Sequence, residues 1–134
     1  MKLDHLAIGV SNIQSALSIY KDLLKLEFIK IEIIENQNVK VAILNISGIK
    51  IELLEPINTN SPIYKFVQNS MSKLHHICFE VDDIKAVINN LLEKGAIIID
   101  HKPRQGAHDT KVAFIHPKSS NNVLIELSEI PNKS

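Results

Sequence analysis

The sequence predicts an α+β fold built from two tandem βαβββ modules, and three observations indicate it. Lys2–Ile13 matches Lys73–Ile84 at a shift of 71 residues, with Lys, Leu, His, Val and Ile coinciding. The tripeptide Lys-Val-Ala at 40–42 recurs at 111–113 with the same shift. In both halves, alternating apolar residues, a stretch of helical periodicity and three further alternating stretches follow one another.

A third match fixes the end of each module. Ile51–Glu55 recurs as Ile125–Glu129 at a shift of 74 residues, and the three extra residues fall in a turn, where insertions are tolerated. Matches in one order and nearly one register are typical of a tandem duplication. The sequence therefore predicts one domain over residues 1–134, with module one at 1–56, a linker at 57–72 and module two at 73–131.

In the first module, residues 2–10 alternate as a strand, and residues 12–25 have helical spacing with Ser11 or Asn12 as the N-cap. Ser47 and Gly48 form a turn between the last two strands. The three remaining strands are expected near 27–34, 39–46 and 49–55.

The second module repeats this pattern. A strand at 74–81 precedes a helix at 83–94, which Asp82 and Asp83 open and Gly95 closes. Strands are expected near 96–101, 111–116 and 122–129, a short helix within the linker at 62–69, and a mobile flap at 102–110.

Composition excludes several classes of protein. Fifteen basic residues balance fifteen acidic ones, so no net charge attracts the chain to nucleic acid or to an anionic membrane. No apolar run reaches the roughly 20 residues of a membrane span. The single cysteine and the absence of a targeting segment at Met1 favour a cytoplasmic protein without disulfides.

One histidine and one glutamate per module occupy matched positions on strands. His5 and His76 point away from the bulky apolar face of their strands, and Ala7 and Gly9 leave room beside His5. Glu52 and Glu126 lie at equivalent points of the last strands, between apolar neighbours. A single such residue is usually a packing or surface residue. Two matched pairs instead predict a metal site, because unpaired buried carboxylates are costly.

The four ligands, two nitrogens and two carboxylates, suit a divalent transition metal. Co²⁺ or Mn²⁺ is favoured, with Ni²⁺, Zn²⁺ and Fe²⁺ as alternatives. An octahedral ion held by four protein ligands would keep two adjacent positions for a bidentate small-molecule substrate. The predicted ligands are His5, Glu52, His76 and Glu126.

At these residues the sequence resembles the vicinal oxygen chelate superfamily, which includes glyoxalases, extradiol dioxygenases and bleomycin-resistance proteins. Within it, the chain is most similar to the methylmalonyl-CoA epimerases. The most specific motifs are PRQGAH at 103–108 and the HPKS turn within 111–127. Asp109 and Ser120–Asn122 depart from the family pattern, which often has Gly there. The motifs that mark only the superfamily are DHLAIGV (4–10), IELLEP (51–56) and LHHICFEVDDI (74–84).

The resemblance implies a vicinal oxygen chelate, or glyoxalase-like, fold: a curved mixed sheet around a metal site. It also implies an isomerase that interconverts (R)- and (S)-methylmalonyl-CoA through a metal-stabilised enolate, in propionate metabolism. Glu126 and Glu52 would be the two catalytic bases, although the second base could lie elsewhere. Arg104, Lys118 and Ser119 would bind the substrate carboxylate or the CoA phosphates. The partner is an acyl-CoA, and a homodimer is expected.

Two other functions remain open. Lactoylglutathione lyase (glyoxalase I) would use the same metal and bases on a glutathione adduct, and Glu52 does not separate the two activities. A metal-free ligand-binding or resistance protein would not need all four ligands. Cys78 is interpreted as inert packing, and His116 with Pro117 as turn structure.

Overall fold

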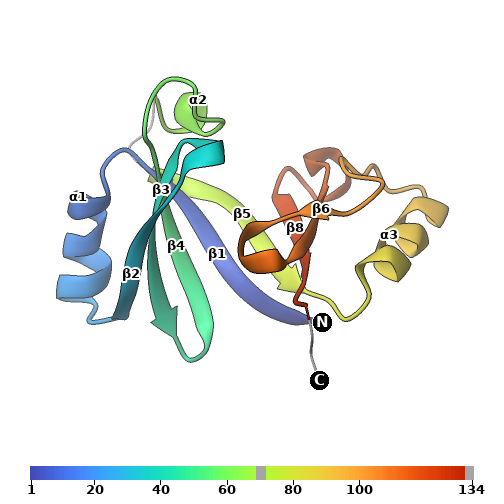
Figure 1. Ribbon diagram of the computed structural model, residues 1–134, viewed down its shortest axis with the longest axis horizontal. Coiled ribbons are helices and arrows are strands. Elements are labelled where there is room, and N and C mark those ends of the chain that lie inside the picture. The colour runs from blue at the N-terminus through green and yellow to red at the C-terminus, as the bar shows by residue number, and fades with distance from the viewer. Residues whose placement is uncertain (69–71, 132–134) are drawn as a thin grey trace. The chain divides into compact units, whose positions relative to one another are not determined.

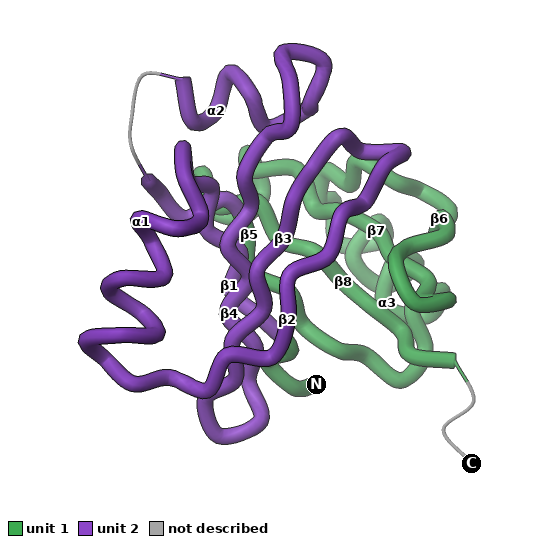
Figure 2. Tube along the Cα trace, turned by 60° about the vertical axis from the view of Figure 1, so that its left-hand side comes forward, with its two compact units in different colours: residues 1–4, 76–134 green, residues 5–75 purple. Residues whose placement is uncertain are grey.

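The computed structural model describes residues 1–68 and 72–131, and the chain divides into two compact units. Unit 1 contains residues 1–4 and 76–134, and unit 2 contains residues 5–75 (Figure 2). Strand β1 therefore begins in unit 1 and continues in unit 2. No helix in the described part of the chain is long and apolar enough to cross a membrane.

Unit 2 holds the strand–helix–three-strand order predicted for the first half. Its strands lie in the spatial order β2-β3-β4-β1, with β1 and β4 parallel and the other neighbours antiparallel (Figure 1). The predicted linker helix is present but shorter, and position 69 lies outside the described residues. The elements are β1 (Lys2–Val10), α1 (Ile13–Leu17), η1 (Ser18–Leu23, a π-helix), β2 (Glu27–Ile34), η2 (Glu35–Gln37), β3 (Val39–Ile46), β4 (Ile49–Pro56) and α2 (Tyr64–Gln68).

Unit 1 repeats the arrangement. Its strands lie in the order β5-β8-β7-β6, with β5 and β8 parallel and the others antiparallel. The predicted fold class, two βαβββ modules with mixed strand pairing, is confirmed. The elements are β5 (Ser72–Glu80), α3 (Ile84–Glu93), β6 (Arg104–Gln105), η3 (Ala107–Asp109), β7 (Lys111–Ile115), η4 (Pro117–Ser119) and β8 (Leu124–Glu129).

Both module helices begin and end as their sequences predict. The Asn12 side chain accepts a hydrogen bond from the Ser15 N–H at 2.9 Å, and Asp83 caps α3 in the same way. Beyond the helix ends, Gly95 has a φ of 83° and Lys25 a φ of 63°, the left-handed conformation common just after a helix. Glycine adopts this conformation without strain, whereas lysine does not.

The apolar faces of the strands pack as their alternation predicts. In unit 2, Val10 packs with Ala16 and Leu17 of α1, while Ala7 belongs to a separate cluster with Ile63. In unit 1, a corresponding cluster joins α3 to β7 and β8. The strand residues that face away from α1 are therefore covered by other parts of unit 2.

The room beside His5 has an occupant. A Cβ atom on Gly9 would lie 2.8 Å from Val67 and 3.0 Å from Phe66, both on α2. Because atoms do not approach that closely, glycine is required where α2 crosses β1. The space that the small side chains leave near Gly9 is thus filled by the chain itself.

The strand expected at 96–101 is wrong. Only an isolated bridge joins Ile98 to Ile115, although the Ile99 N–H donates to the Phe114 carbonyl at 2.8 Å. In a continuing antiparallel ladder the Phe114 N–H would return to the Ile99 carbonyl. It donates instead to Asp100 Oδ2 at 2.9 Å, so a side chain ends the ladder.

The segment predicted as a flap at 102–110 is partly paired. Arg104 and Gln105 form β6 against β7, and η3 follows. His108 and Asp109 have φ values of 57° and 61°, and Asn121 and Asn122 have 52° and 70°. The departures from the family's glycines at Asp109, Asn121 and Asn122 therefore lie at left-handed positions, which Asp and Asn tolerate better than other residues.

A pair of strand-end glutamates ties each helix to its sheet. Glu55 Oε1, at the end of β4, accepts the Ile13 N–H of α1 at 2.7 Å. Glu129 Oε1, at the end of β8, accepts the Ile84 N–H of α3 at 3.0 Å. Each carboxylate satisfies a helix N–H that has no partner within the helix and lies at the positive end of the helix dipole.

Removing either of these carboxylates should destabilise the protein. Glu55→Ala and Glu129→Ala are each expected to lower the free energy of unfolding by about 1–2 kcal/mol, the range of a helix cap with a charged acceptor. Urea denaturation followed by circular dichroism measures this. Glu93→Ala, an exposed change at the other end of α3, is the control and should stay within about 0.5 kcal/mol. Equal losses in Glu93→Ala and Glu129→Ala would contradict the capping role.

Candidate metal centre

Unit 2 brings His5 and Glu52 together. Strands β1 and β4 are parallel, with His5 opposite Lys50 and Ala7 opposite Glu52. His5 Nε2 lies 3.6 Å from Glu52 Oε1, and the two side chains are 10% and 21% exposed. The imidazole and the carboxylate are therefore neighbours on the largely covered face of the β1/β4 pair.

Unit 1 repeats this arrangement with His76 and Glu126. His76 lies opposite Leu124, and Cys78 lies opposite Glu126. His76 Nε2 lies 3.0 Å from Glu126 Oε1, and the side chains are 10% and 14% exposed. In each unit the glutamate is thus two residues beyond the partner of the histidine.

Each pair has the geometry of two ligands of one cation. Metal bonds of about 2.1 Å from a nitrogen and an oxygen at a right angle separate the two donor atoms by roughly 3 Å. The His76–Glu126 distance of 3.0 Å fits that requirement, and the His5–Glu52 distance of 3.6 Å is close to it. Histidine nitrogen and carboxylate oxygen are also the donors that divalent transition metals share. The residues present therefore fit a divalent cation.

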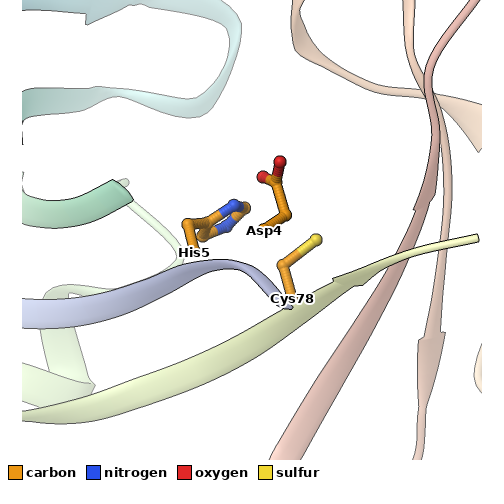
Figure 3. A group of neighbouring side chains, drawn as sticks. All are labelled: Asp4, His5 and Cys78. Atoms are coloured by element: carbon orange, nitrogen blue, oxygen red, sulfur yellow. The ribbon is translucent and has the colours of Figure 1, made fainter. Parts of the chain in front are cut away.

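Other side chains surround the unit 1 pair. The ring of Phe114 packs edge-on against His76, with centroids 5.8 Å apart, and Phe114 lies opposite Glu126 in the β7/β8 pairing. Cys78 is fully buried in the same strand as His76. A carboxylate oxygen of Asp4 lies within 4.8 Å of the Cys78 sulfur, and Figure 3 shows these two side chains projecting from β1 and β5.

The residues predicted to bind substrate lie in two different parts of unit 1. Arg104, on β6, has its Nε 3.1 Å from Asp100 Oδ1 and its guanidinium carbon 5.3 Å from the centre of the Phe114 ring. Lys118 and Ser119 lie in η4. Ser119 Oγ accepts the Ile97 N–H at 2.8 Å, which gives this hydroxyl a structural role.

The interpretation of His116 as turn structure is confirmed. Its Nδ1 accepts the Lys118 N–H at 3.0 Å and so caps η4. His75 packs edge-on against Phe66, with ring centroids 4.8 Å apart. These contacts account for His116 and His75 without a metal.

Sequence reasoning missed Phe114 and Asp100. Phe114 contacts both His76 and Arg104, and Asp100 holds both Arg104 and the backbone of Phe114. The repeat contained a signal for Phe114, because a shift of 71 residues places it on Ile43, which lies opposite Glu52. An aromatic residue opposite only one of two matched glutamates marks a difference between the modules.

Comparison with known proteins identifies the family. Residues 4–114 match the model of the Glyoxalase/Bleomycin resistance protein/Dioxygenase superfamily. The chain therefore belongs to this superfamily, in agreement with its two βαβββ units and its matched histidine–glutamate pairs.

Individual relatives narrow the comparison. The chain is 39% identical to the uncharacterized protein YqjC of Bacillus subtilis, covering 96% of this chain and 91% of that protein. It is 40% identical to the mitochondrial methylmalonyl-CoA epimerase of Dictyostelium discoideum, covering 96% and 78%. A solved methylmalonyl-CoA epimerase in complex with methylmalonyl-CoA and NH4+ superimposes with a TM-score of 0.83 at 27% identity, covering 97% and 94%.

Proposed function

We propose that this protein is a methylmalonyl-CoA epimerase that interconverts the (R) and (S) forms of methylmalonyl-CoA and uses a divalent metal. The observation that carries the proposal is the pair of repeat-related histidine–glutamate contacts in a chain that matches epimerases over 96% of its length. The PRQGAH and HPKS segments support the same activity over that of a glyoxalase. A cytoplasmic location and a homodimer remain predictions from the sequence.

The proposed metal ligands are His5, Glu52, His76 and Glu126. Each histidine must be neutral at Nε2 to donate a lone pair, so its proton would reside on Nδ1. When bound, the cation would act as a Lewis acid and lower the energy of the negative charge that develops on the substrate's carbonyl oxygen. Co²⁺ or Mn²⁺ is favoured because the donor set mixes nitrogen and oxygen.

The chain's own residues would move the proton. The α-carbon of methylmalonyl-CoA lies between a thioester and a carboxylate, so its proton is acidic enough for a carboxylate base in a preorganised site. Glu126 would accept the proton on one face, and Glu52 would deliver one to the other face. Both side chains are largely covered, which limits competition from water. Glu126 is the better supported of the two bases.

Metal content tests the ligand set. After reconstitution with Co²⁺ and removal of free ion, elemental analysis should give about one metal per chain, because four protein ligands bind tightly together. His76→Ala and His5→Ala should each lose most of the metal. His75→Ala removes an adjacent imidazole that packs on Phe66, and it should retain the metal. Normal metal content in His76→Ala would remove that residue from the site.

Substrate preference tests the activity. The purified, metal-loaded protein should epimerise methylmalonyl-CoA with a kcat/KM at least about 100-fold above its kcat/KM for the methylglyoxal–glutathione adduct, since a hydrogen-bonded site rejects a substrate that leaves its polar groups unpaired. Incorporation of deuterium from deuterated water measures the first reaction, and absorbance of the thioester product measures the second. The opposite ranking would make the protein a glyoxalase.

Substitution of the two bases tests the proton path. Glu126→Gln and Glu52→Gln keep an oxygen ligand and remove the base, so each should lower epimerisation by about 10²–10⁴-fold. Each variant should still exchange the α-proton of one epimer with deuterated water, and the two variants should retain opposite epimers. Metal content is measured in parallel. Near-normal turnover in Glu52→Gln would restrict Glu52 to metal binding and place the second base on another residue.

A further inference from the structure

We propose that a basic cleft between α3 and β6 of unit 1 binds the phosphates of coenzyme A. The proposal rests on the acyl-CoA substrate of the proposed function and adds a recognition site to it. The cleft has a cavity volume of about 670 Å³, within the usual range for small-molecule sites. Its polar lining comes from Lys85, Asn89, His101, Lys102, Arg104 and Lys111.

The charge of the cleft is strongly one-sided. Four of the lining residues are cationic and none is acidic, in a protein whose total charge is zero. Arg104 is paired with Asp100, and Lys111 lies 3.9 Å from Glu129. Among the described residues, neither Lys85 nor Lys102 has an ion-pair partner. Clustered cations repel one another, and an anionic ligand relieves that repulsion.

Lys85 is in an electrostatically unfavourable position without such a ligand. It lies in the first turn of α3, which contains no acidic residue. The positive end of the helix dipole disfavours a cation there and favours an anion. A phosphate group in the cleft would be attracted both by the helix end and by the lysine.

Arg104 is held ready for a bidentate ligand. Its Nε is paired with Asp100, and its plane is supported by the ring of Phe114. Both terminal nitrogens remain on the exposed side of a side chain that is 58% accessible. A guanidinium fixed through Nε presents its outer edge to phosphate oxygens, the geometry that arginine recognises best.

The cleft is close to the candidate metal ligands of the same unit. Phe114 contacts Arg104 on one side and His76 on the other, so one aromatic ring separates the cleft from the His76–Glu126 pair. Coenzyme A carries its diphosphate and its 3′-phosphate on a flexible arm that ends at the thioester. A substrate with its reacting carbon near Glu126 can therefore place its phosphates among these cations.

Unit 2 has no equivalent cleft charge. The residue that corresponds to Lys85 in α1 is Gln14, by the shift that aligns Ile13 with Ile84. In the strand pairing, Arg104 lies opposite Val112, and its counterpart opposite Val41 is Glu32. The cations were therefore placed on one module only, which favours a role in ligand recognition over a role in the fold shared by both.

A double substitution tests the cleft. Lys85→Ala with Lys102→Ala should raise the KM for methylmalonyl-CoA by about 10–100-fold and leave kcat within about twofold, because the lost contacts act on binding rather than on the reacting carbon. Lys65→Ala with Lys94→Ala removes the same charge from exposed positions outside the cleft and should leave KM unchanged. An equal rise in both double variants, or no rise in the first, would overturn the proposal.

A truncated substrate and direct binding separate this proposal from the proposed activity. Methylmalonyl-N-acetylcysteamine lacks the nucleotide, so the cleft variant should turn it over as the unchanged protein does. Calorimetry with adenosine 3′,5′-bisphosphate, with coenzyme A and with inorganic phosphate distinguishes the nucleotide from a free anion. Binding of coenzyme A that the cleft variant loses, in a protein without epimerase activity, would refute the proposed function and keep the cleft. Activity without any loss of binding in the variant would do the reverse.

Discussion

The parallel pairing of the first and last strands of each module is the constraint on which the candidate site depends. It places Glu52 two residues beyond the partner of His5, and Glu126 two residues beyond the partner of His76. Because side chains alternate faces along a strand, a register slip of one residue would move the glutamate to the opposite face. A single pairing geometry, used twice, thus produces both histidine–glutamate contacts.

The same last strands also hold the helices. Glu52 and Glu55 are three residues apart on β4 and so point to opposite faces, one toward His5 and the other toward the start of α1. Glu126 and Glu129 divide the work in the same way on β8. A slip in the strand would therefore break the helix cap as well as the site, and the cap helps to maintain the register on which the site relies.

Sequence patterns predicted what depends on local periodicity and on the repeat. The strands at 27–34 and 39–46, the Asn12 and Asp83 caps and the matched positions of the four candidate ligands follow from these signals. The strand at 96–101 failed because one side chain, Asp100, takes a hydrogen bond that the ladder needs, and periodicity does not register such competition. The basic cleft was not predicted as a unit, since its lysines come from positions 85 to 111 and meet only through the packing of α3 beside β6.

Duplication alone would give a site with no direction. Two modules with the same histidine and glutamate would bind an unsymmetrical substrate equally well in either of two orientations, and the two bases would then exchange roles at random. The differences between the modules remove that ambiguity. Phe114 stands where the first module has Ile43, and Arg104 stands where it has Glu32, so the aromatic support and the positive charge belong to unit 1 alone. A phosphate-bearing substrate would be anchored from that side, and Glu126 and Glu52 would each meet a defined face of its α-carbon. On this view the repeat supplies the ligands, and its divergence assigns the two carboxylates their separate roles in stereochemical inversion.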